Sequence, residues 1–274
     1  MSTKIEDIEL RLLLEAIFHK YGYDFRNYSM ASLKRRLLQA CEEFKCRSFS
    51  QLQDYILHDM ESAHAILAFM TVQVSEMFRD PSYFKAFREQ VVPVLRTYPS
   101  IKLWIAGCSA GEEFYSFAII LKEENLLDKT VFYCTDINHQ ALNKAKTGIY
   151  SLDRMKKFSM NYRAAGGTSS LSDYYTTSYD AAIFDKSLRK NVVFSDHSLV
   201  SDASFGEMHF ISCRNVLIYF DKTLQDRVLG LFKDSLIRSG YLGLGAKENM
   251  LFSIHRNAFE EVIKNERIFH KISV

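Results

Sequence analysis

Residues 103–115 read LWIAGCSAGEEFY and decide the fold of this chain. An apolar run passes through small residues into a pair of carboxylates and then into a helical pattern. Gly107 and Gly111 allow a tight turn and a close approach of the backbone to another group, because glycine has no Cβ atom. This arrangement is typical of a ligand site at the carboxyl end of a parallel β-strand.

The two glutamates after Gly111 indicate which ligand the loop accepts. A phosphate-binding loop has Gly-Lys-Ser/Thr here, whereas Glu112 and Glu113 repel a polyphosphate. A second strand-like run, TVFYCT at residues 130–135, ends in Asp136, a place from which an acid hydrogen-bonds ribose hydroxyls. Together these features favour S-adenosylmethionine over ATP or NAD. The alternative is an ordinary turn with a solvated pair of glutamates.

Apolar runs rich in Val, Ile and Phe alternate with helical patterns beyond Pro81. We expect strands near residues 101–106, 130–135, 192–195, 207–212, 241–245 and 267–272. We expect helices near residues 81–96, 112–124, 138–146 and 222–239, the last ended by Gly240. This alternation predicts a mostly parallel sheet with helices on both faces.

Residues 1–68 have helical periodicity and little strand character, which predicts a small all-helical domain before the domain formed by residues 69–274. The first helix has a broad apolar stripe that Gly22 ends, made of Ile5, Ile8, Leu12 and Ala16 with Leu13, Ile17, Leu14 and Phe18 alongside. Residues 149–190 interrupt the alternation and have no helical period. Their composition leaves a long surface loop and a short antiparallel sheet equally open.

Composition limits the class of protein. The 274 residues, 47% of them hydrophobic, suffice for one large core and a small satellite domain. A net charge of +2 without a long basic run argues against a nucleic-acid partner. Five cysteines without a C-x-x-C pair indicate neither a disulfide framework nor a zinc site. The charged N-terminus and the absence of a long apolar run predict a soluble cytoplasmic protein.

Two further motifs accompany the glycine loop: CRNVLIYFD at residues 213–221 and TVQVSEMFRD at residues 71–80. Taken in their order along the chain, at residues 71–80, 103–115 and 213–221, the three motifs resemble those of the chemotaxis receptor methyltransferases, the CheR family. The resemblance covers nearly the whole chain. It implies a Rossmann-like class I S-adenosylmethionine-dependent methyltransferase sheet with an N-terminal helical domain. It also implies a small antiparallel β-subdomain inserted at 149–190, which in the family can tether a receptor tail.

The resemblance assigns roles to single residues. Arg79 matches a family arginine that lies at the cofactor and the incoming carboxylate; the alternative is an exposed arginine at the start of a helix. Tyr219 matches a family tyrosine in the active site; the alternative is a tyrosine of the core. The positions that match cofactor contacts are Gln73, Ser75, Arg79, Glu112, Glu113, Asp136, Ser198, Leu199, Cys213 and Arg214. Gln73, Ser75, Ser198 and Phe114 depart from the family's usual residues, so we expect altered cofactor affinity more readily than lost binding.

A carboxylate acceptor suits these residues. A glutamate side chain has a reference pKa of about 4.3 and needs no catalytic base at neutral pH, so the protein has only to position it and exclude water. The resemblance implies methyl ester formation on glutamates of a chemoreceptor's cytoplasmic helices, with S-adenosylhomocysteine as the product. We expect a monomer that does not insert into the membrane. A non-catalytic cofactor-binding adaptor and a methyltransferase of small carboxylic acids are the alternatives.

A basic run, LKRRLLQ at residues 33–39, places Lys34, Arg35 and Arg36 together, and Arg26 lies shortly before them. By resemblance these bases bind the acidic methylation helices of a receptor, whereas a solvated charged face is the alternative. His139 and His197 lie near the predicted site without a partner at metal-ligand spacing, so we expect no metal.

Overall fold

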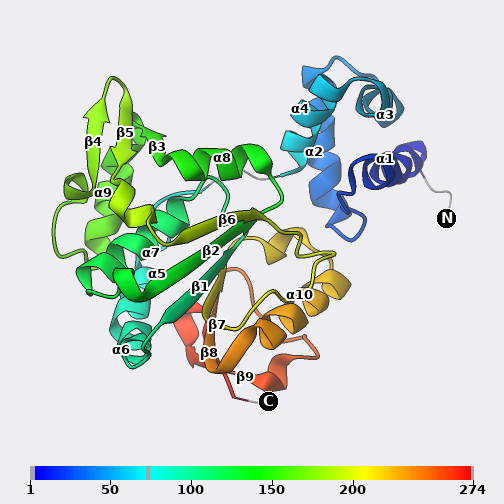
Figure 1. Cartoon of the computed structure of the whole chain (residues 1–274). Helices are drawn as coiled ribbons and strands as arrows, with labels where there is room; N and C mark the ends of the chain where they lie inside the picture. The colour runs from blue at the N-terminus through cyan, green and yellow to red at the C-terminus, as the bar shows by residue number, and fades with distance from the viewer. Residues whose placement is uncertain (1–3, 72–74, 273–274) are drawn as a thin grey trace. The chain divides into compact units, whose positions relative to one another are not determined.

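The computed structural model describes residues 4–71 and 75–272 (Figure 1). The chain forms two compact units: Met1–Val72 together with Ile218–Arg227, and Gln73–Leu217 together with Val228–Val274. We call the first the helical unit and the second the sheet unit. The short segment 218–227 therefore belongs with the helical unit, although it follows a strand of the sheet unit.

The helical unit contains α1 (Ile5–Tyr21), α2 (Met30–Glu43), α3 (Phe49–His58) and α4 (Met60–Met70). Helix α1 buries Leu10, Leu13, Leu14 and Ile17, which follow the i, i+3, i+4, i+7 spacing of one helix face. The predicted stripe is confirmed in part. Leu13, Leu14 and Ile17 are buried, whereas Ile5, Ile8 and Leu12 are 76%, 48% and 53% exposed and do not belong to the core. Both sets have helical spacing, and periodicity alone does not decide between two such faces.

The sheet unit contains a seven-stranded sheet in the order β6-β2-β1-β7-β8-β10-β9. Strands β6, β2, β1, β7 and β8 run parallel to one another, and β10 is antiparallel to both of its neighbours. The predicted mostly parallel sheet is confirmed. The strands are β1 (Ile101–Ala106), β2 (Thr130–Asp136), β6 (Val192–Asp196), β7 (Met208–Cys213), β8 (Leu236–Leu244), β9 (Phe259–Ile263) and β10 (Ile268–Lys271).

The helices that accompany the sheet are α5 (Pro81–Ala86), α6 (Val92–Arg96), α7 (Glu112–Glu123), α8 (His139–Thr147) and α10 (Lys222–Ser235). The helix expected over 81–96 is divided by a π-helical turn at Phe87–Val91. Pro93 lacks an N–H and cannot donate to a preceding turn of regular helix, which accounts for the irregularity. Helix α10 ends four residues earlier than expected, because β8 begins at Leu236 and includes Gly240.

Side chains of β1 alternate between two buried faces of the sheet. Leu103 and Ile105 belong to the main core, in which the rings of Phe117 and Phe210 lie 5.6 Å apart. The fully buried Trp104 lies on the opposite face, 5.3 Å from the ring of Phe232 in α10. Helices α7 and α10 accordingly cover opposite faces of the sheet (Figure 1), as the sequence predicts.

Residues 149–190 fold into the short strands β3 (Ile149–Ser151), β4 (Tyr175–Ser178) and β5 (Ala181–Phe184), in the antiparallel order β3-β5-β4. The small antiparallel sheet is confirmed. The structure adds α9 (Met155–Ala164), which we did not predict. Its buried residues Met155, Phe158 and Tyr162 do have helical spacing, but the period spans too few turns to stand out. Short 3₁₀ turns lie at Leu127–Lys129, Leu152–Arg154, Leu171–Tyr174, Lys186–Arg189, Leu217–Tyr219, Arg256–Ala258 and Lys264–Glu266.

The turn after β1 requires glycine for reasons internal to the protein. Gly107 has a φ of 74°, and a Cβ atom there would lie 2.5 Å from Cγ2 of Val216. Gly111 has a φ of 90°, and a Cβ atom there would lie 2.8 Å from that of Ala145. The close approach expected at these glycines is therefore one to neighbouring segments of the chain.

Replacing Gly107 by alanine is expected to destabilise the fold through both backbone strain and this clash. Gly22 ends α1 at a φ of 76° with nothing within 4 Å of its missing Cβ, so Gly22→Ala measures the backbone strain alone. That strain costs about 1 to 2 kcal/mol, and Gly107→Ala is expected to lose about 1 to 3 kcal/mol more through overpacking. Denaturant unfolding measures both losses, and equal losses would contradict the clash.

Candidate functional site

The loop after β1 is tied to the end of β2 by backbone hydrogen bonds. Gly107 N and Cys108 N donate to the carbonyl oxygen of Thr135 at 2.8 and 2.9 Å. Ser109 N donates to Oδ2 of Asp136 at 2.8 Å. These bonds bring the glycine loop and Asp136 together at one edge of the sheet, where carboxyl ends of the parallel strands meet.

Asp136 is oriented by two backbone donors. Besides Ser109 N, the amide of Asn138 donates to Oδ1 at 2.9 Å. Burial raises the pKa of Asp136 above its ordinary value, although these two hydrogen bonds act in the opposite direction. An ionised carboxylate offers about four acceptor positions, so this side chain retains acceptor capacity for the hydroxyls of a ligand.

Glu113 and the buried Arg214 form an ion pair at the same edge. Arg214 Nη1 lies 3.1 Å from Glu113 Oε2, and its side chain is only 1% exposed. Ser212 Oγ donates to Glu113 Oε1 at 2.7 Å. Arg214 Nη2 donates at 2.8 Å both to Oδ2 of Asp80 and to the carbonyl oxygen of Arg79. One guanidinium thus connects the end of β7, the first turn of α7 and the segment that carries Arg79.

Glu112 is held from a different direction. Its side chain is 2% exposed, and Oε1 accepts a hydrogen bond from Arg154 Nη1 at 2.8 Å. Arg154 Nη2 donates to the carbonyl oxygen of Ser75. The two neighbouring glutamates therefore have different partners, and neither is the solvated carboxylate of the alternative interpretation.

Among the described residues, the buried polar atoms without a hydrogen-bond partner include Oε2 of Glu112 and Nε of Arg214 at this edge. Buried groups of this kind are rare and call for a missing partner. Glu112 Oε2 is a hydrogen-bond acceptor on a carboxylate, and Arg214 Nε is a hydrogen-bond donor on a guanidinium. A ligand with both an ammonium and a carboxylate group, such as the amino-acid part of S-adenosylmethionine, fits this pair. Asp136 fits the ribose of the same molecule.

The remaining predicted cofactor residues differ in their surroundings. Leu199 and Cys213 are buried, and burial raises the pKa of the Cys213 thiol, which makes it an inert core residue. Ser198 Oγ accepts hydrogen bonds from Val200 N and Ser201 N at 3.3 Å, so its hydroxyl supports a local turn. Gln73 lies outside the described residues.

Arg79 and Tyr219 belong to different units. Arg79 is half-buried in the sheet unit, and its neighbours Phe78 and Asp80 have φ values of 52° and 57°, which are unusual for residues other than glycine. Tyr219 lies in the helical unit, where the guanidinium of Arg36 stacks 4.5 Å from the centre of its ring.

The predicted basic residues are only partly available to a partner. Arg36 is 8% exposed and donates to the carbonyl oxygen of Met70 at 2.7 Å, so the expectation that it lies on an exposed basic face is wrong. Lys34 pairs with Glu6 at 2.7 Å and Asp7 at 3.0 Å. Arg26 pairs with Asp24 at 2.9 Å and Glu15 at 3.2 Å. Arg35 is exposed.

Sequence reasoning missed Ser212 and Arg154. Ser212 precedes Cys213 in a strand that is otherwise largely apolar, and this buried hydroxyl was a usable signal. Arg154 is separated from Ser75 by 79 residues and lies in a segment without a recognised period. Nothing in its local sequence points to Glu112.

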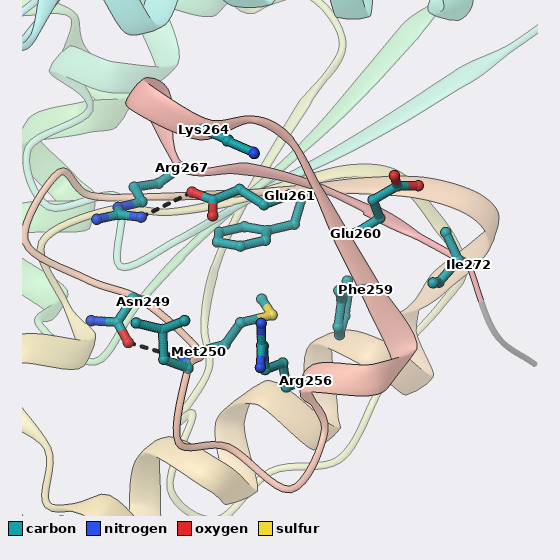
Figure 2. A pocket seen from close by; sticks show the side chains of 11 residues that line it. Asn249, Met250, Arg256, Phe259, Glu260, Glu261, Lys264, Arg267 and Ile272 are labelled. Atoms are coloured by element: carbon teal, nitrogen blue, oxygen red, sulfur yellow. Dashed lines mark hydrogen bonds and ion pairs between the residues drawn. The ribbon is translucent and has the colours of Figure 1, made fainter.

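A cavity of about 590 Å³ lies away from these residues, between β9, β10 and the segment 249–256 (Figure 2). Figure 2 shows that Arg267 and Glu261, which both line it, are paired with each other. Arg267 Nη1 lies 2.9 Å from Glu261 Oε1. None of the residues predicted to bind the cofactor lines this cavity. It is therefore distinct from the edge formed by Glu112, Glu113 and Asp136.

Comparisons with known proteins identify the family of the chain. The model of the CheR methyltransferase SAM binding domain matches residues 73–268, and that of the CheR methyltransferase all-alpha domain matches residues 8–71. Cher3 of Pseudomonas putida KT2440 is 56% identical over 98% of this chain and 99% of that protein. A chemotaxis protein methyltransferase of Listeria monocytogenes is 28% identical over 84% of this chain and 86% of that protein.

Likeness to solved structures is weaker. The plantazolicin methyltransferase BpumL, solved with a triazolic desmethylPZN analog and SAH, has a TM-score of 0.38 and 11% identity, over 78% of this chain and 58% of that one. The family assignment therefore rests on sequence, which it covers almost completely. The chain belongs to the CheR methyltransferase family and is an S-adenosylmethionine-dependent methyltransferase.

Proposed function

We propose that this protein methylates glutamate side chains on the cytoplasmic domain of a chemoreceptor or a related signalling protein. The observation that carries the proposal is the anchoring of Arg79 at the acid-lined edge. Arg214 binds the carbonyl oxygen of Arg79 at 2.8 Å and the carboxylate of Glu113 at 3.1 Å. The backbone that carries Arg79, a cation suited to an incoming carboxylate, is thus tied to the proposed cofactor residues.

For methyl transfer to a glutamate, the protein has mainly to position the carboxylate against the methyl group of the cofactor. Bound S-adenosylmethionine supplies a methyl group on a sulfonium, and a glutamate carboxylate is already an ionised nucleophile at neutral pH. Arg79 would orient this carboxylate through its planar guanidinium. Glu112, Glu113, Asp136 and Arg214 would hold the cofactor, and Gln73, Ser75, Ser198, Leu199 and Cys213 remain predicted contacts. The Tyr219 hydroxyl is proposed to donate to the oxygen that is not methylated.

The partner is proposed from the family and from the basic run at residues 34–36 of the helical unit. Relatives of this chain are named chemotaxis protein methyltransferases. Arg35 is the exposed member of the predicted basic group and is the residue best placed to meet acidic receptor helices. None of the described helices is both long and apolar enough to cross a membrane. We propose that the protein acts as a cytoplasmic monomer.

Lowering the pH is expected to weaken S-adenosylhomocysteine binding through Asp136. Ribose hydroxyls would donate to the ionised carboxylate, so binding opposes protonation, and burial raises the pKa of Asp136 above 3.8 in the free protein. Affinity should therefore fall as the pH is lowered toward this raised pKa. Asp136→Asn should weaken binding by about 1 to 3 kcal/mol and remove most of the pH dependence.

Calorimetry at several pH values measures this effect. Asp128→Asn is the matched control, because Asp128 is exposed and lies just before β2, at the end of that strand opposite Asp136. If Asp136→Asn bound as tightly as the wild type, Asp136 would not contact the ribose.

Arg79→Ala is expected to abolish methyl ester formation while the protein stays folded, because it removes the guanidinium that orients the acceptor. The reaction uses labelled cofactor and receptor cytoplasmic fragments, and a glutamyl ester is identified by release of its label in base. Loss of a preorganised charge-stabilising donor costs about 100-fold or more in rate. Arg96→Ala, at a half-exposed arginine paired with Glu124 at 2.9 Å, is the control.

Each outcome has a definite meaning. Near wild-type turnover by a folded Arg79→Ala protein would remove Arg79 from the site. Wild-type protein that binds S-adenosylhomocysteine yet leaves no base-labile label on any receptor fragment would favour the adaptor over the enzyme.

Arg35→Glu is expected to raise KM for a receptor fragment between about two- and tenfold, since exposed charge contacts are individually weak. Cofactor affinity should not change. Added salt should shrink the difference, because ionic strength screens exposed charges. Arg47→Glu makes the same charge change at another exposed site of the helical unit and serves as the control. Equal KM values for Arg35→Glu and Arg47→Glu would exclude Arg35 from the docking surface.

A further inference from the structure

Helix α9 of the insertion runs along the segment that leads to Arg79. Three residues at helical spacing contact three successive residues of that segment. Arg154, at the N-terminal boundary of α9, binds the carbonyl oxygen of Ser75. Lys157 Nζ lies 2.5 Å from Oε1 of Glu76, and Asn161 Nδ2 donates to the carbonyl oxygen of Met77 at 3.0 Å.

The next residue of the segment, Phe78, is also fixed in part by α9. Its ring lies 5.3 Å from that of Tyr162, and its amide donates to Ser116 Oγ of α7 at 2.8 Å. Phe78 is fully buried with a φ of 52°. A bulky residue keeps such a backbone conformation only where its surroundings impose it. The insertion is therefore part of what shapes the backbone before Arg79.

Arg154 differs from the other two contacts because it also reaches the glutamate pair. Its guanidinium joins the Ser75 carbonyl to Glu112 Oε1, whereas Lys157 makes an exposed pair with Glu76 alone. Glu112 is 2% exposed, and its second oxygen has no partner within residues 4–71 and 75–272. With Oε1 occupied by Arg154, Oε2 is the oxygen left for a donor on a ligand.

We propose that Arg154 is a positioning residue of the cofactor site. It fixes the rotamer of Glu112 so that Oε2 receives the cofactor's ammonium group, and in doing so it makes cofactor affinity depend on the inserted subdomain. The proposal rests on the assignment of Glu112 as a cofactor residue. A planar fork suits this role, since it serves the carboxylate and the carbonyl at once, and lysine as a point donor replaces it only in part.

The test measures S-adenosylhomocysteine affinity of the full chain by calorimetry. Arg154→Met is expected to weaken binding at least tenfold, and Arg154→Lys by less. Lys157→Met, which removes the exposed pair from the same helix, should leave the affinity unchanged because such pairs contribute little. An Arg154→Met protein with wild-type affinity would overturn the proposal, as would an equal loss in Lys157→Met.

A double-mutant cycle separates positioning from a general loss of stability. Glu112→Gln removes the charge that Arg154 faces. If Arg154 acts through Glu112, adding Arg154→Met to Glu112→Gln should cause little further loss of affinity. Fully additive losses would overturn the proposal. The double variant carries no unpaired buried charge, so it keeps the test usable if Arg154→Met alone fails to fold.

These outcomes do not depend on the methylated substrate. The assay contains no receptor, so a protein that fails to methylate glutamate can still show the dependence on Arg154. If Glu112→Gln binds S-adenosylhomocysteine like the wild type, the assignment of Glu112 fails first, and with it the role given to Arg154.

Discussion

The buried guanidinium of Arg214 is the interaction on which the site depends. It is almost fully removed from solvent and has carboxylates on two sides, Glu113 at 3.1 Å and Asp80 at 2.8 Å. A charge buried to this degree is costly unless it is paired and hydrogen-bonded. Its partners come from separate parts of the chain, so the folded arrangement that satisfies Arg214 also sets the backbone at Arg79 beside the glutamates.

The sheet register brings the second half of the site to the same place. Ala106 pairs with Thr135 between β1 and β2, so the glycine loop begins where Asp136 ends its strand. The backbone N–H groups of the loop then donate hydrogen bonds to Thr135 and Asp136. Its glycines are needed because Val216 and Ala145 fill the space in which side chains would stand. Packing within the protein thus determines the position of Glu112 and Glu113, which follow the loop, before any ligand binds.

The features that could be predicted from the sequence are those that short segments determine. The strand–loop–helix at 103–115 and the end of β2 at Asp136 follow from local patterns, and their pairing follows from the rules of parallel sheets. Burial of individual charges does not follow in this way. Lys34, Arg35 and Arg36 are adjacent in the sequence, yet one is ion-paired, one exposed and one buried against Tyr219. Arg154 could not be found at all, because its partners are distant in the sequence.

The boundary between the two units lies within the motif CRNVLIYFD, between Leu217 and Ile218, and the sequence does not show it. Cys213 and Arg214 end a strand of the sheet unit, whereas Tyr219 lies in the segment that belongs to the helical unit. Four residues therefore separate the guanidinium that organises the proposed cofactor edge from a tyrosine whose ring is contacted by Arg36. The pairing of Arg36 with Tyr219 gives a buried basic residue of the helical unit a reason to be there that is independent of receptor docking. The motif is thus a covalent link between the unit that holds the proposed cofactor residues and the unit proposed to recognise the receptor.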